Sequence, residues 1–133
     1  MHLIPICPRP TPRPRFGKHG AYNEPKYTSY KNSLVNYLSL LKIPTLDYDY
    51  VHAQFYIPYP KNTPKKNLID KHPLRSKFDC DNVIKGLLDA LEQSKILKND
   101  RQLSGLYIEK FYTTNSEGYI LFELQEYEDG IKE

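Results

Sequence analysis

Two carboxylates stand one residue apart in residues 78–85, FDCDNVIK. Asp79 and Asp81 lie where a basic, proline-containing segment gives way to apolar residues with helical spacing. Adjacent anions repel each other, and a divalent cation with oxygen ligands neutralises such a pair. Mg²⁺ keeps several waters and needs only one or a few carboxylates. Lys85 follows Asp81 by four residues and so lies on the same side of the predicted helix, where its charge could stabilise a phosphoryl transition state.

The same residues also have a purely structural interpretation. Asp81 alone is explained as the N-cap of a helix, where a carboxylate also interacts well with the helix dipole. Lys85 alone is explained as an exposed residue paired with Asp89 one turn further on. Cys80 has no base partner, and a thiolate is a poor Mg²⁺ ligand, so we expect it to pack. An Asp-X-Asp motif before a helix is therefore weak evidence for a metal site by itself.

Two helices are predicted from apolar residues that recur every three or four positions. The first begins near residue 27, with Thr28 or Ser29 as its cap, and ends before Pro44. The second begins near Asp81, which we expect to be its N-cap.

Four strands are predicted around these helices. They cover residues 2–7, 50–57, about 103–112 and 120–124. In residues 50–57 apolar and polar side chains alternate, which is typical of a strand with one buried face. The order β-α-β-α-β-β predicts one α+β domain over residues 1–133, with a small mixed sheet and two main helices in two layers.

The net charge of +3 is unevenly distributed. A Pro/Arg-rich arm at 8–26 is expected to be extended, in the polyproline II manner. A basic loop at 58–78 follows the second predicted strand, and the tail at about 126–133 is acidic. This pattern indicates a local anionic partner.

Composition argues against several classes of protein. No apolar run approaches the roughly 20 residues of a membrane span, and no secretory signal is visible. Two cysteines, Cys7 and Cys80, do not make a disulfide framework. We therefore expect a cytoplasmic protein that does not contact membranes.

Three motifs taken together resemble the signature of the RusA-type Holliday junction resolvases. That signature reads D-x-D-N-x-x-K, then D-A-L, then D-D-x-Q before a strand, and residues 79–85, 88–91 and 100–102 match it without gaps. The arm sequence PRPRFG at 12–17 is similar to that of phage and Gram-positive members. The resemblance covers residues 8 to about 112. In one departure, the first acid of the final turn is Asn99 here.

The resemblance implies a role for each matching residue. Asp79, Asp81 and Asp100 would bind Mg²⁺, with Mn²⁺ as an alternative, and no small-molecule cofactor is implied. Lys85 would be the catalytic lysine. Asp100 is matched to the essential acid because Gln102 keeps its distance from it.

Two neighbouring residues are assigned to a second tier. We expect Asp89 to orient Lys85 or to serve structure in preference to binding metal. Phe78 either packs under the site or wedges into an opened junction, and packing is the simpler role.

The implied activity is a crossover junction endodeoxyribonuclease, encoded by a bacterium or a phage, that acts in DNA recombination and repair. It would nick four-way DNA in pairs and leave 5′-phosphate and 3′-hydroxyl ends. Paired nicks on a two-fold symmetric junction call for a homodimer. Basic residues that flank the site are expected to contact DNA phosphates: Arg13, Arg15, Lys18, Arg75 and Lys77.

Two other functions remain open on the sequence. A metal nuclease for flaps, other branched DNA or RNA would use the same acids. A non-catalytic DNA-binding accessory protein of recombination would retain the fold without the chemistry, and Asn99 favours it. A structural protein bound through its Pro/Arg arm would leave Asp79, Asp81 and Asp100 unexplained.

Overall fold

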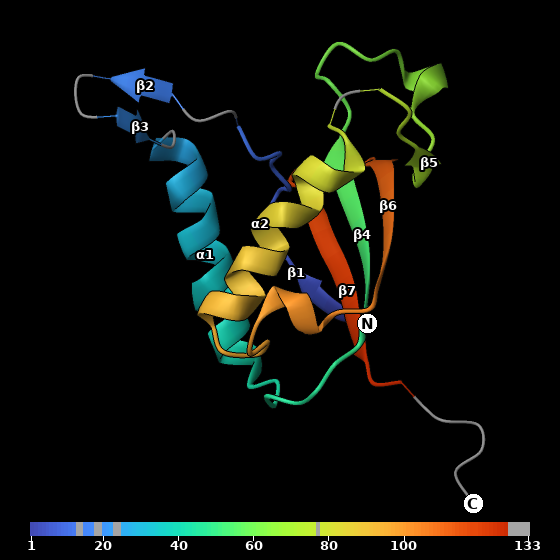
Figure 1. The fold of residues 1–133 in the computed structure, drawn as a ribbon. Helices are drawn as coiled ribbons and strands as arrows, with labels where there is room; N and C mark the ends of the chain where they lie inside the picture. Colours follow the sequence, from blue (N-terminus) through green and yellow to red (C-terminus); the bar gives the residue numbers. More distant parts are fainter. Residues whose placement is uncertain (13–14, 18–19, 23–24, 77, 128–133) are drawn as a thin grey trace, which may run out of the picture.

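The computed structural model describes residues 1–12, 15–17, 20–22, 25–76 and 78–127. Within these ranges a five-stranded mixed sheet has the order β1-β7-β4-β6-β5, and helices α1 and α2 lie side by side against one of its faces (Figure 1). The predicted α+β architecture is confirmed. The elements are β1 (His2–Ile4), β2 (Arg15–Gly17), β3 (Gly20–Tyr22), α1 (Pro25–Leu41), β4 (Tyr50–Pro58), η1 (Lys65–Asn67), β5 (His72–Pro73), α2 (Cys80–Gln93), η2 (Asp100–Gln102), β6 (Gly105–Thr113) and β7 (Tyr119–Gln125).

The central strand β4 fixes the direction of α2. It pairs antiparallel with β7 and parallel with β6, and parallel neighbours require a connection that crosses back over the sheet. Helix α2 lies in that connection. It therefore begins at the edge where β4 and β6 end and runs back towards the edge where β6 begins.

The core lies between the sheet and the two helices. Val51, Ala53 and Phe55 of β4 face it and are fully buried or nearly so, which confirms the alternation predicted for this strand. On the opposite face His52 and Gln54 both contact Glu109 of β6, at 2.8 and 2.9 Å. The helices thus cover one face only.

Several local features differ from the sequence prediction. Helix α1 begins at Pro25, so Thr28 and Ser29 lie inside the helix and do not cap it; proline is favoured in a first turn because its missing N–H would have no partner there. Within the arm, β2 and β3 pair as an antiparallel hairpin instead of extending. The basic loop contains η1 and the short strand β5. No described helix has the length and apolar character to cross a bilayer.

Gly118, in the turn between β6 and β7, is required by its backbone conformation. Its φ is +71°, and a Cβ at this position would lie 2.8 Å from the Tyr56 carbonyl oxygen. We expect Gly118→Ala to lower the free energy of unfolding by about 1–3 kcal/mol because it adds both strain and a clash. Urea unfolding would measure this, with Ser116→Ala in the same exposed turn as the control. Equal stability of the two variants would contradict the expectation.

Candidate active site

The N-terminal end of α2 presents two acidic side chains. The helix begins at Cys80, so Asp79 occupies the N-cap position and Asp81 lies in the first turn. The expectation that Asp81 is the N-cap was therefore wrong by two residues. The Asp79 side chain makes no capping hydrogen bond, and its backbone carbonyl accepts instead from the amides of Asn82 and Val83. Both carboxylates are exposed, at a helix end whose dipole favours negative charge.

Phe78 sets the path by which the chain enters α2. Its φ is +52°, a left-handed conformation that is costly for a bulky residue. Its carbonyl oxygen accepts a hydrogen bond of 2.7 Å from Lys110 Nζ on β6. Sequence reasoning missed Lys110, because nothing in the pattern of β6 distinguishes this lysine from a solvent-facing one. The structure thus places a second lysine beside the residue that precedes Asp79.

Lys85 and Asp89 do not form the pair that the structural interpretation expected. Asp89 is half-buried and forms an ion pair of 3.5 Å with Lys31 of α1, so it links the two helices. Lys85 is exposed one turn beyond Asp81 and makes no ion pair within the described part of the chain. Its amine is therefore available to an external anion.

Asn99, which replaces the first acid of the family turn, caps η2. Its side-chain oxygen accepts a hydrogen bond of 2.8 Å from the amide of Arg101. Asparagine is among the residues preferred at such a cap. Asp100 follows as the first residue of η2, with an exposed side chain. The departure from the family pattern thus has a structural role in holding this turn.

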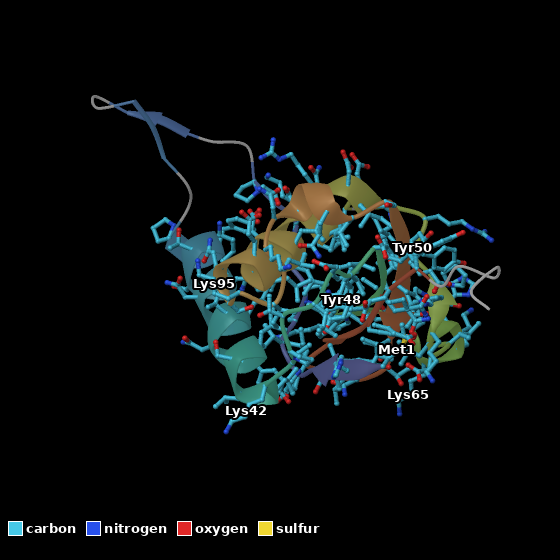
Figure 2. All side chains as sticks on the ribbon, turned by 60° about the horizontal axis from the view of Figure 1, so that its bottom comes forward. Met1, Lys42, Tyr48, Tyr50, Lys65 and Lys95 are labelled. Atoms are coloured by element: carbon cyan, nitrogen blue, oxygen red, sulfur yellow. The ribbon has the colours of Figure 1, made fainter. Side chains whose placement is uncertain are left out.

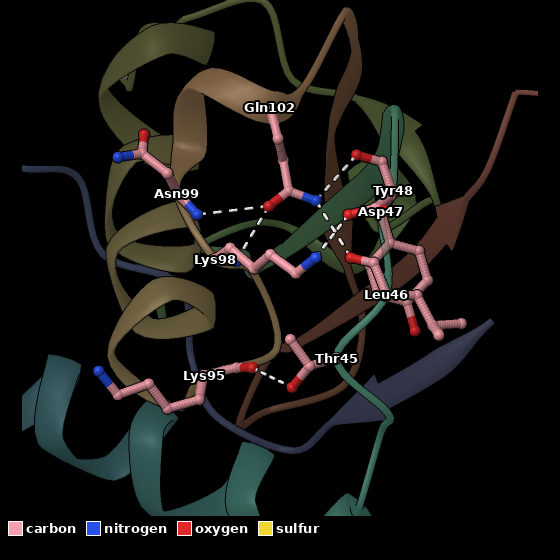
Figure 3. Close-up of polar contacts among 8 residues, drawn as sticks. All are labelled: Thr45, Leu46, Asp47, Tyr48, Lys95, Lys98, Asn99 and Gln102. Carbon is pink, nitrogen blue, oxygen red and sulfur yellow. Dashed lines mark hydrogen bonds and ion pairs between the residues drawn. The ribbon is translucent and has the colours of Figure 1, made fainter.

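Gln102 fastens the same turn to the rest of the fold (Figure 3). Its side-chain oxygen accepts from the amides of Lys98 and Asn99, at 2.9 and 3.3 Å. Its side-chain nitrogen donates to the carbonyls of Leu46 and Tyr48, at 3.2 and 3.1 Å. Leu46 and Tyr48 belong to the segment that enters β4. Asp100 is therefore held at the edge of the sheet where β4 and β6 begin.

The acidic residues consequently lie at two separate places. The 14 residues of α2 span about 21 Å at roughly 1.5 Å per residue. Asp79 and Asp81 are at the N-terminal end, whereas η2, the orange turn in Figure 1, lies beside the C-terminal part of α2. Among the described residues no three His, Cys, Asp or Glu side chains are grouped so that they could hold a metal ion. One protomer brings together Asp79, Asp81 and Lys85, but not Asp100.

The two carboxylates at the start of α2 are ligands of the kind that Mg²⁺ takes. Carboxylate oxygens are the hard ligands that this ion takes, and their exposure leaves room for the waters it retains. A single protomer offers Asp79 and Asp81, and one or two carboxylates are what Mg²⁺ usually takes beside its waters. The third acid that the resemblance implies, Asp100, does not lie beside them.

The predicted DNA contacts are described only in part. Arg75 is exposed in the segment between β5 and α2, on the approach to Asp79. Arg15 lies in β2, but its side chain is outside the described structure. Arg13, Lys18 and Lys77 lie outside the described residues.

Comparison with protein families gives one match. The family model described as "Endodeoxyribonuclease RusA" matches residues 5–121 of the 133-residue chain, a span that includes Asp79, Asp81, Lys85 and Asp100. No curated protein matches the chain. The matched span contains all three motifs, both helices and the strands β4, β5 and β6. The chain therefore belongs to the RusA family of endodeoxyribonucleases.

Proposed function

We propose that this protein is a Mg²⁺-dependent endonuclease that resolves four-way DNA junctions by paired, symmetric nicks. The observation that carries the proposal is the pair of exposed carboxylates at the start of α2. Neither the Asp79 nor the Asp81 side chain makes a hydrogen bond or ion pair within the described structure, although helix ends normally use such side chains for capping. In a chain of a nuclease family, exposed acidic side chains without a hydrogen-bond or ion-pair partner in the described structure are well placed to bind an external cation.

Each residue of this end has a role in phosphodiester hydrolysis. Asp79 and Asp81 would hold the cation, and Lys85 would pair with the phosphate and offset the charge that develops on it. A bound Mg²⁺ would polarise the phosphate and lower the pKa of the attacking water. Lys110 holds the Phe78 carbonyl and so keeps the chain direction into Asp79 fixed. Water adds to phosphorus and the 3′-oxygen leaves, which gives 5′-phosphate and 3′-hydroxyl ends.

In this proposal, Asp100 contributes its carboxylate to the site of a second copy of the chain. Its side chain is exposed and held by the turn that Asn99 and Gln102 fix, but a helix length separates it from Asp79. A C₂ dimer that sets this turn against the α2 N-terminus of the partner would make two equivalent three-carboxylate sites. Two such sites match the two symmetric nicks that a junction requires.

The alternative of a non-catalytic accessory protein is less well supported once Asn99 has a structural role. That alternative relied on Asn99 as a missing acid. The Asn99 side chain caps η2, and the resemblance matches Asp100, not Asn99, to the essential acid.

The proposal is tested by the choice of substrate. Synthetic four-way junctions, linear duplex, flaps and RNA of matched sequence would be incubated with the protein and Mg²⁺. We expect the junction to be nicked at symmetric positions and the linear duplex to remain intact. Preferential cleavage of flaps or RNA would instead support a different metal nuclease.

Lys85→Ala is expected to reduce junction cleavage about 100-fold, because a charge that stabilises the transition state is lost. Single-turnover cleavage with saturating protein measures this effect without interference from weaker binding. Lys61→Ala, in the loop after β4, serves as a matched lysine substitution. Cleavage at the wild-type rate by the Lys85 variant would mean that Lys85 is merely an exposed helix residue.

A further inference from the structure

A groove runs between the N-terminal segment 6–12 and the first turns of α1. It consists of two adjoining cavities of about 490 and 410 Å³, which share Cys7, Arg9 and Lys26 as lining residues. Each cavity has space for a phosphate group with its sugar. The groove lies outside the cluster formed by Asp79, Asp81 and Lys85.

The described lining of the groove is cationic and rich in hydroxyl groups. Arg9 and Lys26 supply positive charge, and Ser29, Tyr30 and Ser33 project from one side of α1. No acidic side chain is among the described lining residues of either cavity. The first turn of α1 has no acidic residue either, although Glu24 directly precedes it in the sequence. These features favour an anion.

Tyr30 provides an independent sign of a missing ligand. Its side chain is only 4% exposed, and its hydroxyl is buried without a hydrogen-bond partner. Buried polar atoms in native structures nearly always have a partner. Burial raises the pKa of Tyr30, so its hydroxyl stays protonated. The Tyr30 hydroxyl is thus a buried donor without an acceptor among the described residues.

The groove leads directly to the acidic end of α2. Its second cavity is lined by Tyr27 and by Phe78, which precedes Asp79. The amide and the hydroxyl of Thr11 both donate to the Asn82 carbonyl at 3.0 Å, and the Thr11 hydroxyl is 2.9 Å from that of Tyr27. These bonds fasten the N-terminal segment to the first turn of α2. A DNA strand that passes Asp79 can therefore continue along the groove.

We propose that this groove binds a backbone phosphodiester of the DNA strand being cut, next to the scissile position. Arg9 and Lys26 pair with the phosphate, and the Tyr30 hydroxyl donates to one of its non-bridging oxygens. This inference rests on the proposed function, because it assumes that DNA is the substrate. It assigns DNA contacts to three residues that the basic-segment pattern did not single out.

The first test is the salt dependence of junction binding. Dissociation constants would be measured by fluorescence anisotropy at several KCl concentrations, with EDTA present to prevent cleavage. We expect Arg9→Gln and Lys26→Gln each to weaken binding several-fold and to reduce the slope of log K against log salt by about one. The control is Lys42→Gln, at the opposite end of α1 (Figure 2), which should bind like wild type.

Tyr30→Phe separates a ligand contact from a fold contact. Removal of an unpaired buried hydroxyl should leave thermal stability unchanged or raised. Binding to the junction should nevertheless weaken about three- to tenfold, because the phosphate loses a donor. A Tyr30→Phe protein that binds like wild type would overturn the groove as a phosphate site.

The position on the DNA is tested with single methylphosphonates, which remove the charge of one phosphate at a time. In wild type we expect one position beside the cut to weaken binding when neutralised. In Arg9→Gln the same neutralisation should cause little further loss. Equal further loss in both proteins would overturn the proposal. Failure of the wild type to bind any DNA would contradict the proposed function itself, so the two failures are distinguishable.

Discussion

Replacement of Asp79, Asp81 or Asp100 by asparagine is expected to reduce nicking of a four-way junction at least about 10³-fold, which corresponds to about 4 kcal/mol of transition-state stabilisation. Asparagine keeps the size of the side chain and removes the charge that the cation needs. Junction binding, which depends on basic side chains, should stay within a few-fold of wild type. Single-turnover cleavage and anisotropy in EDTA measure the two quantities separately.

Glu117→Gln is the matched control for these three variants. Glu117 is exposed in the turn between β6 and β7, and the substitution removes the same charge outside the site. This variant should cleave like wild type. Full cleavage by the Asp79, Asp81 and Asp100 variants would contradict the assignment of the metal site.

A mixture of Asp79→Asn and Asp100→Asn proteins should regain activity that neither has alone. If each site takes Asp79 and Asp81 from one protomer and Asp100 from the other, the mixed dimer has one doubly altered site and one intact site. Random exchange makes about half of the dimers mixed, so about a quarter of the wild-type sites would be restored. Restoration would be measured as nicking after subunit exchange.

The same experiment contains its own control. A mixture of Asp79→Asn with Asp81→Asn cannot restore a site, because each intact carboxylate then lies beside an altered one. Native mass spectrometry would establish that mixed dimers have formed. Equal inactivity of both mixtures would contradict a site shared between protomers and would require another route for Asp100 to reach Asp79.

Most of the fold follows from the sequence because its periodic segments are long. The alternation in β4 and the helical spacing in α1 predict those elements directly. The β2–β3 hairpin and β5 were missed, because strands of two or three residues are too short to show an alternation of apolar and polar side chains. The start of α2 was misplaced because Asp79 and Asp81 are both good caps. The contact of Lys110 with the Phe78 carbonyl, which fixes the chain before the helix, is not visible in the sequence.

The candidate site is only partly predictable for a similar reason. Helical spacing is enough to place Asp81 and Lys85 on one side of α2. The position of Asp100 depends on Gln102, whose side chain bonds to Leu46 and Tyr48 more than fifty residues earlier in the chain. The hydrogen bonds from Gln102 to Leu46 and Tyr48 cannot be predicted from the sequence, because these residues are far apart along the chain. The buried hydroxyl of Tyr30 was equally invisible, because its position in the helical pattern marks it only as a core residue.

The most direct test of the account uses a supercoiled plasmid with an inverted repeat that extrudes as a cruciform. Paired nicks across the junction, made within one binding event, convert this plasmid to linear DNA, whereas a single nick gives an open circle. We predict linear product with wild type and Mg²⁺, none with EDTA, and none with Asp81→Asn. Absence of any Mg²⁺-dependent product, or equal nicking of a plasmid without the repeat, would contradict the assignment of a junction-resolving nuclease.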